Sequence, residues 1–349
     1  MINELNYRNE LEKSFKENSD FDYSLLKNKT IMFTGACGLL GRYFIDFVLY
    51  ASKKLNLNTR IIALELKREV LDDLYSEYME SGMLIPVASD VTKPIKIESS
   101  IDYIIHAASP ANPFWFSNYP VDVINANING TFNMLNLAKE KKARFLFISS
   151  GEIYGDQECP LKGFTENQPG IVDSSLVRSC YTESKRCSET LAISFAHQYN
   201  IEAMVARLCY VYGPTYTPNE KRVFFQFLYN YLDEKDIVMK SKGEQVRSYL
   251  YVSDAVLALL HIICYGQNKE AYNVSTTDKP VSVKDIADTF VKLSNGNIKV
   301  VFELAEEESK GFSKFMNAVQ DPSKLMDLGY KPKVSFIDGV KRTINSSKK

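Results

Sequence analysis

Short apolar runs alternate with amphipathic stretches along most of the chain. Five runs predict strands, at residues 31–33, 60–64, 84–87, 103–105 and 144–148. Each is short and largely apolar, as expected for parallel strands that helices cover on both faces. Helical patterns lie between them, among them residues 39–53 and 124–142. This alternation predicts an α/β fold with a Rossmann-type doubly wound parallel sheet.

The pattern changes at both ends of this region. The first 29 residues are polar with scattered aromatics, and they predict a helical extension packed on the outside. The sheet domain is expected over residues 30–212. After Tyr212-Gly213-Pro214 the elements become shorter and mixed, so residues 213–349 predict a smaller mixed α/β domain. Some of that chain is expected to cross back to the sheet near 250–275.

Composition and charge exclude several classes of protein. The 349 residues include 42 Lys and Arg against 43 Asp and Glu, so the chain lacks the basic footprint of a nucleic-acid binder. The longest apolar run, residues 255–264, is half the roughly 20 residues needed to span a bilayer. The N-terminus offers no apolar secretory signal, and six scattered cysteines suggest reduced thiols. We therefore expect a cytoplasmic enzyme that needs no nucleic acid, membrane or metal.

A glycine-rich loop directly follows the first predicted strand. Its spacing is Gly35-x-x-Gly38-x-x-Gly41, and an amphipathic helix follows. Gly35 and Gly38 allow a tight turn whose backbone N–H groups can approach a pyrophosphate, and Gly41 permits close helix–strand packing. Three glycines alone would be weak evidence, but their place between strand and helix favours a dinucleotide site.

The ends of the next strands supply further cofactor candidates. Glu65 ends the second strand, where an acid binds the adenosine ribose and favours NAD over NADP. Lys67 and Arg68 could soften that preference, and a solvated Glu65 is the alternative. Further candidates follow the third and fourth strands, where ligands of such sheets bind: Asp90, Val91, Ala107, Ala108 and Ser109.

A tyrosine and a lysine stand four residues apart in a predicted helix that runs to about Tyr199. Tyr181 and Lys185 therefore project from the same helical face. A cation near a phenol favours the phenolate and lowers its pKa toward the working pH. By spacing alone this would be an ordinary surface pair. Together with the dinucleotide loop and the strand end at Ser149-Ser150, it predicts an active site.

The glycine loop and the Tyr181-x-x-x-Lys185 pair together resemble the extended short-chain dehydrogenase/reductase superfamily, in its NAD-dependent nucleotide-sugar epimerase/dehydratase branch. The resemblance runs from about residue 29 to the end of the chain. Within the branch, two segments are most similar to UDP-glucuronate decarboxylases: Ala108-Ser109-Pro110-Ala111-x-Pro113 and Arg178-Ser-Cys-Tyr-x-Glu-x-Lys-Arg186-x-x-Glu189.

The resemblance implies NAD as the cofactor and assigns roles to individual residues. Tyr181 would take the proton of the sugar 4-hydroxyl, Lys185 would lower the pKa of Tyr181 and hold the nicotinamide ribose, and Ser150 would bind the same hydroxyl. These are general acid–base and positioning roles. The implied cofactor site also includes Cys37, Leu39, Leu40, Asn127, Ser149 and Leu208.

The turn after Ser150 bears on the outcome of the reaction. The family's 4,6-dehydratases carry Asp and then Glu here, whereas this chain has Gly151 and then Glu152. Without the Asp, elimination of water loses its proton donor. Simple 4-epimerases usually lack an acid at the Glu152 position, whereas decarboxylases keep it. A Glu152 that only faces solvent is the alternative.

The substrate of such an enzyme carries a diphosphate and needs fixed cations. Arg222 and Arg247 match family positions that bind the diphosphate or the uridine ribose. Arg178 could contact a carboxylate or simply cap its loop, and Ser109 is also expected at the substrate. Tyr210 departs from the family, which normally has Asn there, and this leaves the identity of the sugar open.

These expectations define an NAD-dependent enzyme that oxidises C4 of a nucleotide-diphosphate sugar transiently. Decarboxylation of a UDP-uronic acid is the leading outcome, with 4-epimerisation or 4,6-dehydration as the alternative. A non-catalytic dinucleotide-sensing regulator is a remote third possibility, because such proteins generally lose the Tyr/Lys pair. The resemblance also implies a homodimer formed through the helices at 124–142 and 182–199.

Overall fold

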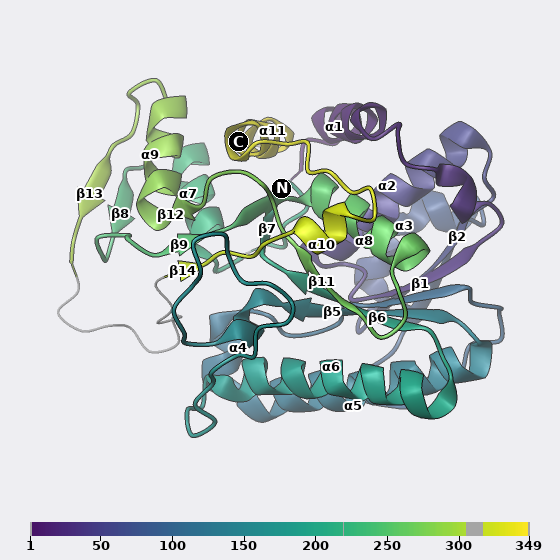
Figure 1. Cartoon of the computed structure of the whole chain (residues 1–349). Helices are drawn as coiled ribbons and strands as arrows, with labels where there is room; N and C mark the ends of the chain where they lie inside the picture. Colours follow the sequence, from purple (N-terminus) through teal and green to yellow (C-terminus); the bar gives the residue numbers. More distant parts are fainter. Residues whose placement is uncertain (1, 219, 305–316, 348–349) are drawn as a thin grey trace.

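The computed structural model contains the five strands that the sequence predicts, and two more strands in the same sheet. It describes residues 2–218, 220–304 and 317–347 (Figure 1). The strands of the central sheet are β1 (Thr30–Thr34), β2 (Arg60–Glu65), β3 (Leu84–Ala88), β4 (Tyr103–His106), β5 (Arg144–Ser150), β6 (Ala203–Leu208) and β11 (Ala271–Val274). Their order is β11-β6-β5-β4-β1-β2-β3, and every pairing is parallel. The predicted Rossmann-type sheet is thus confirmed.

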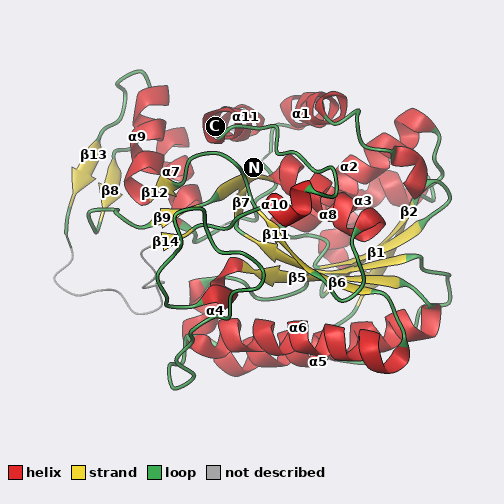
Figure 2. Cartoon of the chain, viewed as in Figure 1, coloured by secondary structure: helices red, strands yellow, loops and turns green. Residues whose placement is uncertain are grey.

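Helices cover both faces of this sheet (Figure 2). One face carries α2 (Leu39–Leu55), α3 (Arg68–Glu80) and α8 (Val252–Tyr265), and the other carries α5 (Pro120–Lys141) and α6 (Ser179–Tyr199). Successive side chains of a strand point to opposite faces. In β1, Ile31 and Phe33 accordingly pack in the core under α2 and α8, whereas Met32 packs in the core under α5 and α6. This two-sided burial explains the largely apolar strand sequences.

Helix α5 begins four residues earlier than the sequence pattern predicts. Pro120 occupies its first turn, where a missing N–H costs nothing. The preceding helix α4 (Pro113–Asn118) is capped by Asn112, whose side chain accepts from the N–H of Trp115.

The N-terminal extension forms α1 (Glu4–Glu17) and a 3₁₀ turn, η1 (Tyr23–Leu26), as expected. It packs beside α2 and the C-terminal helix α11 (Phe336–Ser346) (Figure 1). Glu10 is buried there, and its carboxylate accepts hydrogen bonds from Tyr43 at 2.6 Å and Ser14 at 2.7 Å. The sequence pattern does not predict this polar docking.

The C-terminal part of the chain contains several short helices and small sheets. Its helices are α7 (Val223–Leu232), α9 (Val283–Leu293) and α10 (Ser323–Met326). Its strands pair in small sheets: β7 (Tyr210–Tyr212) with β10 (Tyr249–Tyr251), β8 (Ile237–Met239) with β13 (Val300–Phe302), and β9 (Val246–Arg247) with β12 (Val281–Ser282) and β14 (Asn317–Ala318). The segment containing α8 and β11 returns to the central sheet. The division into domains at residue 213 stays a prediction.

Among the residues that the structure describes, no helix combines the length and the apolar character needed to cross a membrane.

Candidate active site

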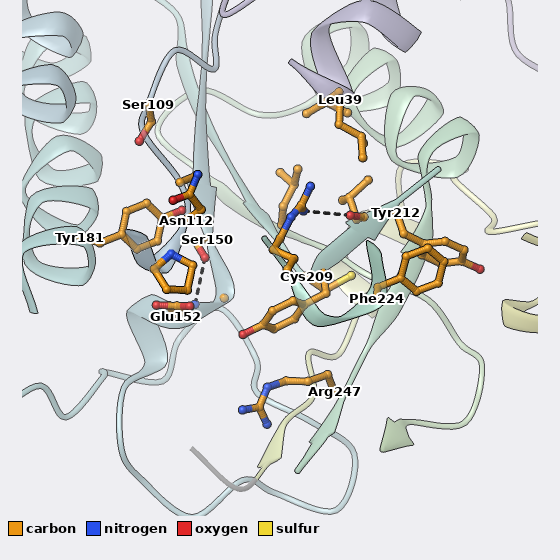
Figure 3. Close-up of a pocket in the computed structure, with 18 of the residues that line it drawn as sticks. Leu39, Ser109, Asn112, Ser150, Glu152, Tyr181, Cys209, Tyr212, Phe224 and Arg247 are labelled. Carbon is orange, nitrogen blue, oxygen red and sulfur yellow. Dashed lines mark hydrogen bonds between the residues drawn. The ribbon is translucent and has the colours of Figure 1, made fainter. Parts of the chain in front are cut away.

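A cavity of about 420 Å³ lies at the carboxyl ends of the strands, between the sheet and the C-terminal part of the chain (Figure 3). Tyr181, Ser150 and Glu152 lie on one side of it, and Tyr212, Phe224 and Arg247 lie on the other. The predicted site residues that line it are Gly35, Gly38, Leu39, Leu40, Ala107, Ser109, Ser149, Ser150, Glu152, Arg178, Tyr181, Lys185, Leu208, Tyr210, Arg222 and Arg247.

The glycine loop has the geometry that a dinucleotide pyrophosphate requires. Gly35 has φ of 73°, in the left-handed region, and its N–H donates to the carbonyl of Leu64. A Cβ on Gly41 would lie 2.4 Å from the carbonyl oxygen of Gly35, so only glycine permits this approach. Gly38 caps α2 without a side-chain hydrogen bond. The N-terminus of α2 thus presents backbone N–H groups and a positive dipole end to an anion.

The end of β4 is fixed against the loop after β1. Thr34 Oγ1 lies 2.8 Å from His106 Nδ1 and accepts from the N–H groups of Ala107 and Ala108 at 3.1 Å. Ser109 Oγ beyond them is buried, lines the cavity and has no hydrogen-bond partner among the described residues. A buried hydroxyl without a partner, in the cavity that the N-terminus of α2 also lines, fits a phosphate group of a bound dinucleotide.

Glu65 stands at the end of β2, as a ribose-binding acid should. One carboxylate oxygen accepts from the N–H of Cys37 at 3.2 Å and the other from the N–H of Leu66 at 2.9 Å. Glu65 therefore also holds the glycine loop, a role that the sequence does not predict.

The other predicted cofactor residues outside the cavity lining have structural partners. Asp90 accepts from the N–H of Thr92 at 2.8 Å, and Val91 packs in the core beside Gly130. Asn127 donates to Ser184 at 2.8 Å, while its Oδ1 has no partner among the described residues. Like Cys37, Glu65 and Ala108, these residues do not line the cavity, and their cofactor contacts stay predictions.

Tyr181 and Lys185 lie in the first turns of α6, and both are buried. The Tyr181 ring stacks on Phe116 with a centroid separation of 4.6 Å. Lys185 Nζ donates to the carbonyl of Ile148 at 2.8 Å and lies 5.8 Å from the centre of the Tyr181 ring. The two side chains therefore share one wall, as the i, i+4 spacing predicts.

Burial dominates the electrostatics of this pair. It raises the pKa of Tyr181 well above the usual range, Glu152 raises it further, and a hydrogen bond with Ser150 opposes the rise. Burial lowers the pKa of Lys185 to about 7, although Glu189 favours its charged form. The protein groups alone thus favour a neutral phenol, and the expected lowering by Lys185 stays a prediction.

The turn after β5 brings a carboxylate and a cation together beside Tyr181. Residues Gly151–Tyr154 form a 3₁₀ turn, η2, in which Ser150 Oγ accepts from the N–H of Glu152 at 3.2 Å. The Glu152 carboxylate accepts two hydrogen bonds from the Arg178 guanidinium, at 2.9 and 3.1 Å. Both side chains are largely buried, with exposed fractions of 15% and 21%. A solvent-facing Glu152 is therefore excluded.

The predicted substrate cations lie on the opposite wall. Arg222 pairs with Glu220 at 3.0 Å, and its guanidinium also donates to the carbonyl of Val211. The Arg247 guanidinium lies 5.8 Å from the centre of the Tyr210 ring. Both cations and Tyr210 line the cavity, so they share a cavity with Tyr181.

Sequence reasoning missed two groups. Glu189, one turn after Lys185, pairs with Arg207 at 2.8 Å and accepts from Ser149 Oγ at 2.5 Å. Gln320 lines the cavity beside Gly151, although it lies far along the chain. The helical spacing of Lys185 and Glu189 was a usable signal for the first, but no local pattern points to Gln320. Among the described residues, no cluster of His, Cys, Asp and Glu could hold a metal ion.

Comparison with known proteins agrees with this geometry. Residues 31–275 match the model of the NAD dependent epimerase/dehydratase family. UDP-glucuronic acid decarboxylase 6 of Arabidopsis thaliana is 32% identical over 90% of this chain and 87% of its own length. UDP-glucuronic acid decarboxylase 1 of Xenopus tropicalis is 30% identical over 92% of this chain and 72% of its own.

Solved structures share the fold. UDP-glucose 4-epimerase of Thermotoga maritima has a TM-score of 0.75 at 21% identity, covering 91% of this chain and 98% of its own. A dTDP-glucose 4,6-dehydratase of Streptomyces venezuelae has a TM-score of 0.76 at 22% identity, covering 90% and 95%. The chain therefore belongs to the NAD-dependent epimerase/dehydratase family and is an NAD-dependent enzyme of this kind.

Proposed function

We propose that the protein is a UDP-glucuronic acid decarboxylase that oxidises C4 of the sugar transiently. The observation that carries this proposal is the buried Arg178–Glu152 pair beside Tyr181, because it places a fixed cation where the carboxylate of a uronic acid can be received. The Arabidopsis and Xenopus relatives named above support the same reaction.

The cofactor would be held by the loop Gly35–Gly41, the N-terminus of α2, Glu65 at the ribose and Ser109 near the phosphates. When bound, NAD⁺ supplies the acceptor for the hydrogen that leaves C4. Its positive charge favours the phenolate of Tyr181, whose pKa is raised by burial in the protein alone.

Tyr181 acts as the general base of the first step. Its phenolate takes the proton of the 4-hydroxyl while C4 becomes a ketone. Ser150 accepts or donates a hydrogen bond at the same oxygen. Lys185, whose Nζ donates to the Ile148 carbonyl, would hold the ribose of the cofactor. Packing against Phe116 keeps the Tyr181 ring in place.

The second step needs little help from the protein. A 4-keto uronic acid is a β-keto acid, so the bond between C5 and C6 breaks, CO₂ leaves and the electron pair passes to the C4 oxygen as an enolate. A proton then returns to C5. The hydride removed in the first step would return from the reduced cofactor to C4, and Tyr181 gives its proton to the oxygen, which restores the 4-hydroxyl. Arg178 holds the departing carboxylate, and Glu152 fixes the orientation of Arg178.

The diphosphate of the substrate is expected on the opposite wall. Arg222 and Arg247 provide charge for it, and Tyr210 limits the space available to the sugar. A UDP-uronic acid in this cavity would therefore extend from Arg178, at the sugar carboxylate, to Arg222 and Arg247, at the diphosphate.

We further propose a homodimer through α5 and α6. Apolar side chains on these helices are exposed in the single chain: Phe132 by 47%, Ile124 by 39% and Tyr199 by 38%. Analytical ultracentrifugation should give twice the mass of one chain, and Phe132→Glu should give monomers.

The six free cysteines support a reducing compartment such as the cytoplasm.

The experiment that tests the function is incubation with NAD⁺ and a panel of UDP-, dTDP-, GDP- and CDP-sugars, read by mass spectrometry. Loss of CO₂ from UDP-glucuronic acid is the expected result. Loss of water, or unchanged mass with altered stereochemistry, would replace decarboxylation by dehydration or epimerisation.

A further inference from the structure

The space beside the catalytic turn, where a side chain of residue 151 would stand, is already filled by Gln320. A Cβ built on Gly151 would lie 2.7 Å from Gln320 Oε1 and 2.8 Å from its Cδ, closer than real Cβ contacts come. The φ of Gly151 is outside the left-handed region. The backbone would therefore accept a side chain, and Gln320 is the obstacle.

Hydrogen bonds hold the Gln320 side chain in this position. Its Nε2 donates to the carbonyl of Arg207 at 3.0 Å and to Asn273 Oδ1 at 3.1 Å. Asn273 is fixed in turn, because its Oδ1 accepts from Tyr154 at 2.7 Å and its Nδ2 donates to the carbonyl of Phe164 at 2.8 Å. Both partners of Gln320 Nε2 are acceptors, so the amide must turn its NH₂ toward them and its oxygen toward Gly151.

Burial and backbone pairing around Gln320 restrict the movement of its side chain. The residue is only 3% exposed, and the backbone on either side of it pairs with Phe164, through Val319 and Asp321 at 2.9 Å each. Moving the amide would break both bonds of Nε2 in a buried place, where an unpaired donor is costly.

Charge adds to the steric exclusion. Gln320 Oε1 is buried and receives no hydrogen bond within the described part of the chain. A carboxylate on residue 151 would face this oxygen with no donor between them, which is unfavourable at low dielectric. An aspartate is therefore excluded more strongly than an alanine.

A second carboxylate at this place would change the chemistry that follows C4 oxidation. Elimination of water from a 4-keto hexose breaks the C5–H bond and the C6–O bond and forms a C5=C6 double bond. One group must take the C5 proton and another must protonate the departing hydroxyl. The turn offers one carboxylate, Glu152, whereas loss of CO₂ requires no acid at residue 151.

We propose that Gln320 is a specificity-determining residue, which confines the catalytic turn to a single carboxylate and thereby excludes elimination of water as an outcome. This inference rests on the proposed function for the reaction that is favoured. The steric relationship itself is independent of any substrate.

A double-mutant cycle in the full-length protein tests the steric relationship. Gly151→Ala should lower Tm by several degrees and reduce turnover of UDP-glucuronic acid at least about tenfold. In the background of Gln320→Ala, the same substitution should cost little in Tm, so that the two effects are far from additive. Gln267→Ala, at an exposed position just after α8, is the matched control and should add independently to Gly151→Ala. Additive effects of Gly151→Ala and Gln320→Ala on Tm would overturn the proposal.

A gain of activity tests the consequence for specificity. Gly151→Asp combined with Gln320→Ala should release a product from UDP-glucose that lacks one water, detected by mass spectrometry, and Gly151→Asp alone should not. A folded double variant without this product, or the product from Gly151→Asp alone, would refute the role of Gln320. If wild-type protein releases no CO₂ from UDP-glucuronic acid while the Tm cycle is strongly coupled, the proposed function fails and the steric role of Gln320 stands.

Discussion

The guanidinium of Arg178, the residue directly before α6, donates to both carboxylate oxygens of Glu152, at 2.9 and 3.1 Å. The pair joins the turn after β5 to the residue that precedes the catalytic helix. Both groups line the cavity beside Tyr181. A bidentate pair of this kind fixes the plane of the guanidinium, so the cation is already oriented before a substrate carboxylate arrives.

Arg178→Ala should reduce kcat/KM for UDP-glucuronic acid by about 100-fold or more. The substitution removes the cation that binds the substrate carboxylate, and it leaves the Glu152 carboxylate unpaired in a largely buried place. Affinity for UDP-glucose, measured by calorimetry, should change far less. Arg8→Ala, at an exposed ion pair, is the control. Equal losses of affinity for UDP-glucuronic acid and UDP-glucose would show that Arg178 does not bind the substrate carboxylate.

Tyr181→Phe should keep NAD⁺ affinity within about twofold and lower kcat by roughly 1,000-fold or more, because it removes the acid–base group while the ring still stacks on Phe116. Cofactor titration followed by fluorescence and steady-state turnover check the two halves of this prediction. Unchanged turnover would rule out Tyr181 as the base.

The pH dependence of C4 oxidation should respond to Glu152. Oxidation requires the phenolate, so its rate rises with pH through the pKa of Tyr181. Burial raises that pKa and the negative charge of Glu152 raises it further, so Glu152→Gln should shift the rising limb to lower pH. Single-turnover formation of NADH provides the measurement, with Glu77→Gln on the exposed surface of α3 as the control. A shift to higher pH, or the same shift in the control, would contradict this electrostatic assignment.

Cofactor choice should depend on Glu65. Glu65→Ala is expected to weaken NAD⁺ binding by about tenfold and to leave NADP⁺ binding nearly unchanged, because the ribose acceptor and the repulsion of a 2′-phosphate disappear together. Glu65→Gln separates the two roles of this residue, since an amide oxygen can still accept from the N–H of Cys37. Calorimetric titration with both cofactors checks the prediction, and equal weakening by Glu65→Ala would exclude the ribose contact.

A buried carboxyl outside the active site should make stability depend on pH. Burial raises the pKa of Asp254 to about 7, although its Oδ2 accepts from the N–H groups of Lys333 and Val334. The folded state holds this proton more tightly than the unfolded state. Protonated Asp254 therefore contributes its full stabilising free energy below about pH 4, and this stabilisation is lost as pH rises to about 7. Asp254→Asn should remove this pH-dependent part of the free energy of unfolding, which is of the order of 2–4 kcal/mol. Denaturation curves recorded between about pH 4 and 7 provide the measurement. If the stability of Asp254→Asn depends on pH as that of the wild type does, another group binds the proton.

The parts of the fold that the sequence predicts are those with a local signal. Strand runs such as 144–148, the loop from Gly35 to Gly41 and the i, i+4 pair of Tyr181 and Lys185 all follow from the spacing of neighbouring residues. Their positions in the sheet and on α6 agree with the structure. Each pattern directly reflects a backbone geometry, which explains why it can be read without tertiary contacts.

The parts that could not be predicted depend on contacts between distant segments. Arg178 and Glu152 were both candidates, but no periodicity pairs them. Gln320 reaches Gly151 only because β14 aligns with β9 and places the following segment against β6 and β11. Glu10 is a polar residue on a polar helix, and only the docking of α1 against α2 explains its burial.

Decarboxylation is tested most directly with UDP-glucuronic acid labelled isotopically at C6, incubated with the protein and NAD⁺. The label should leave as CO₂, and the remaining UDP-sugar should be a pentose without it. Label that stays in the nucleotide sugar, while that sugar changes in stereochemistry or loses water, would contradict decarboxylation as the reaction of this site.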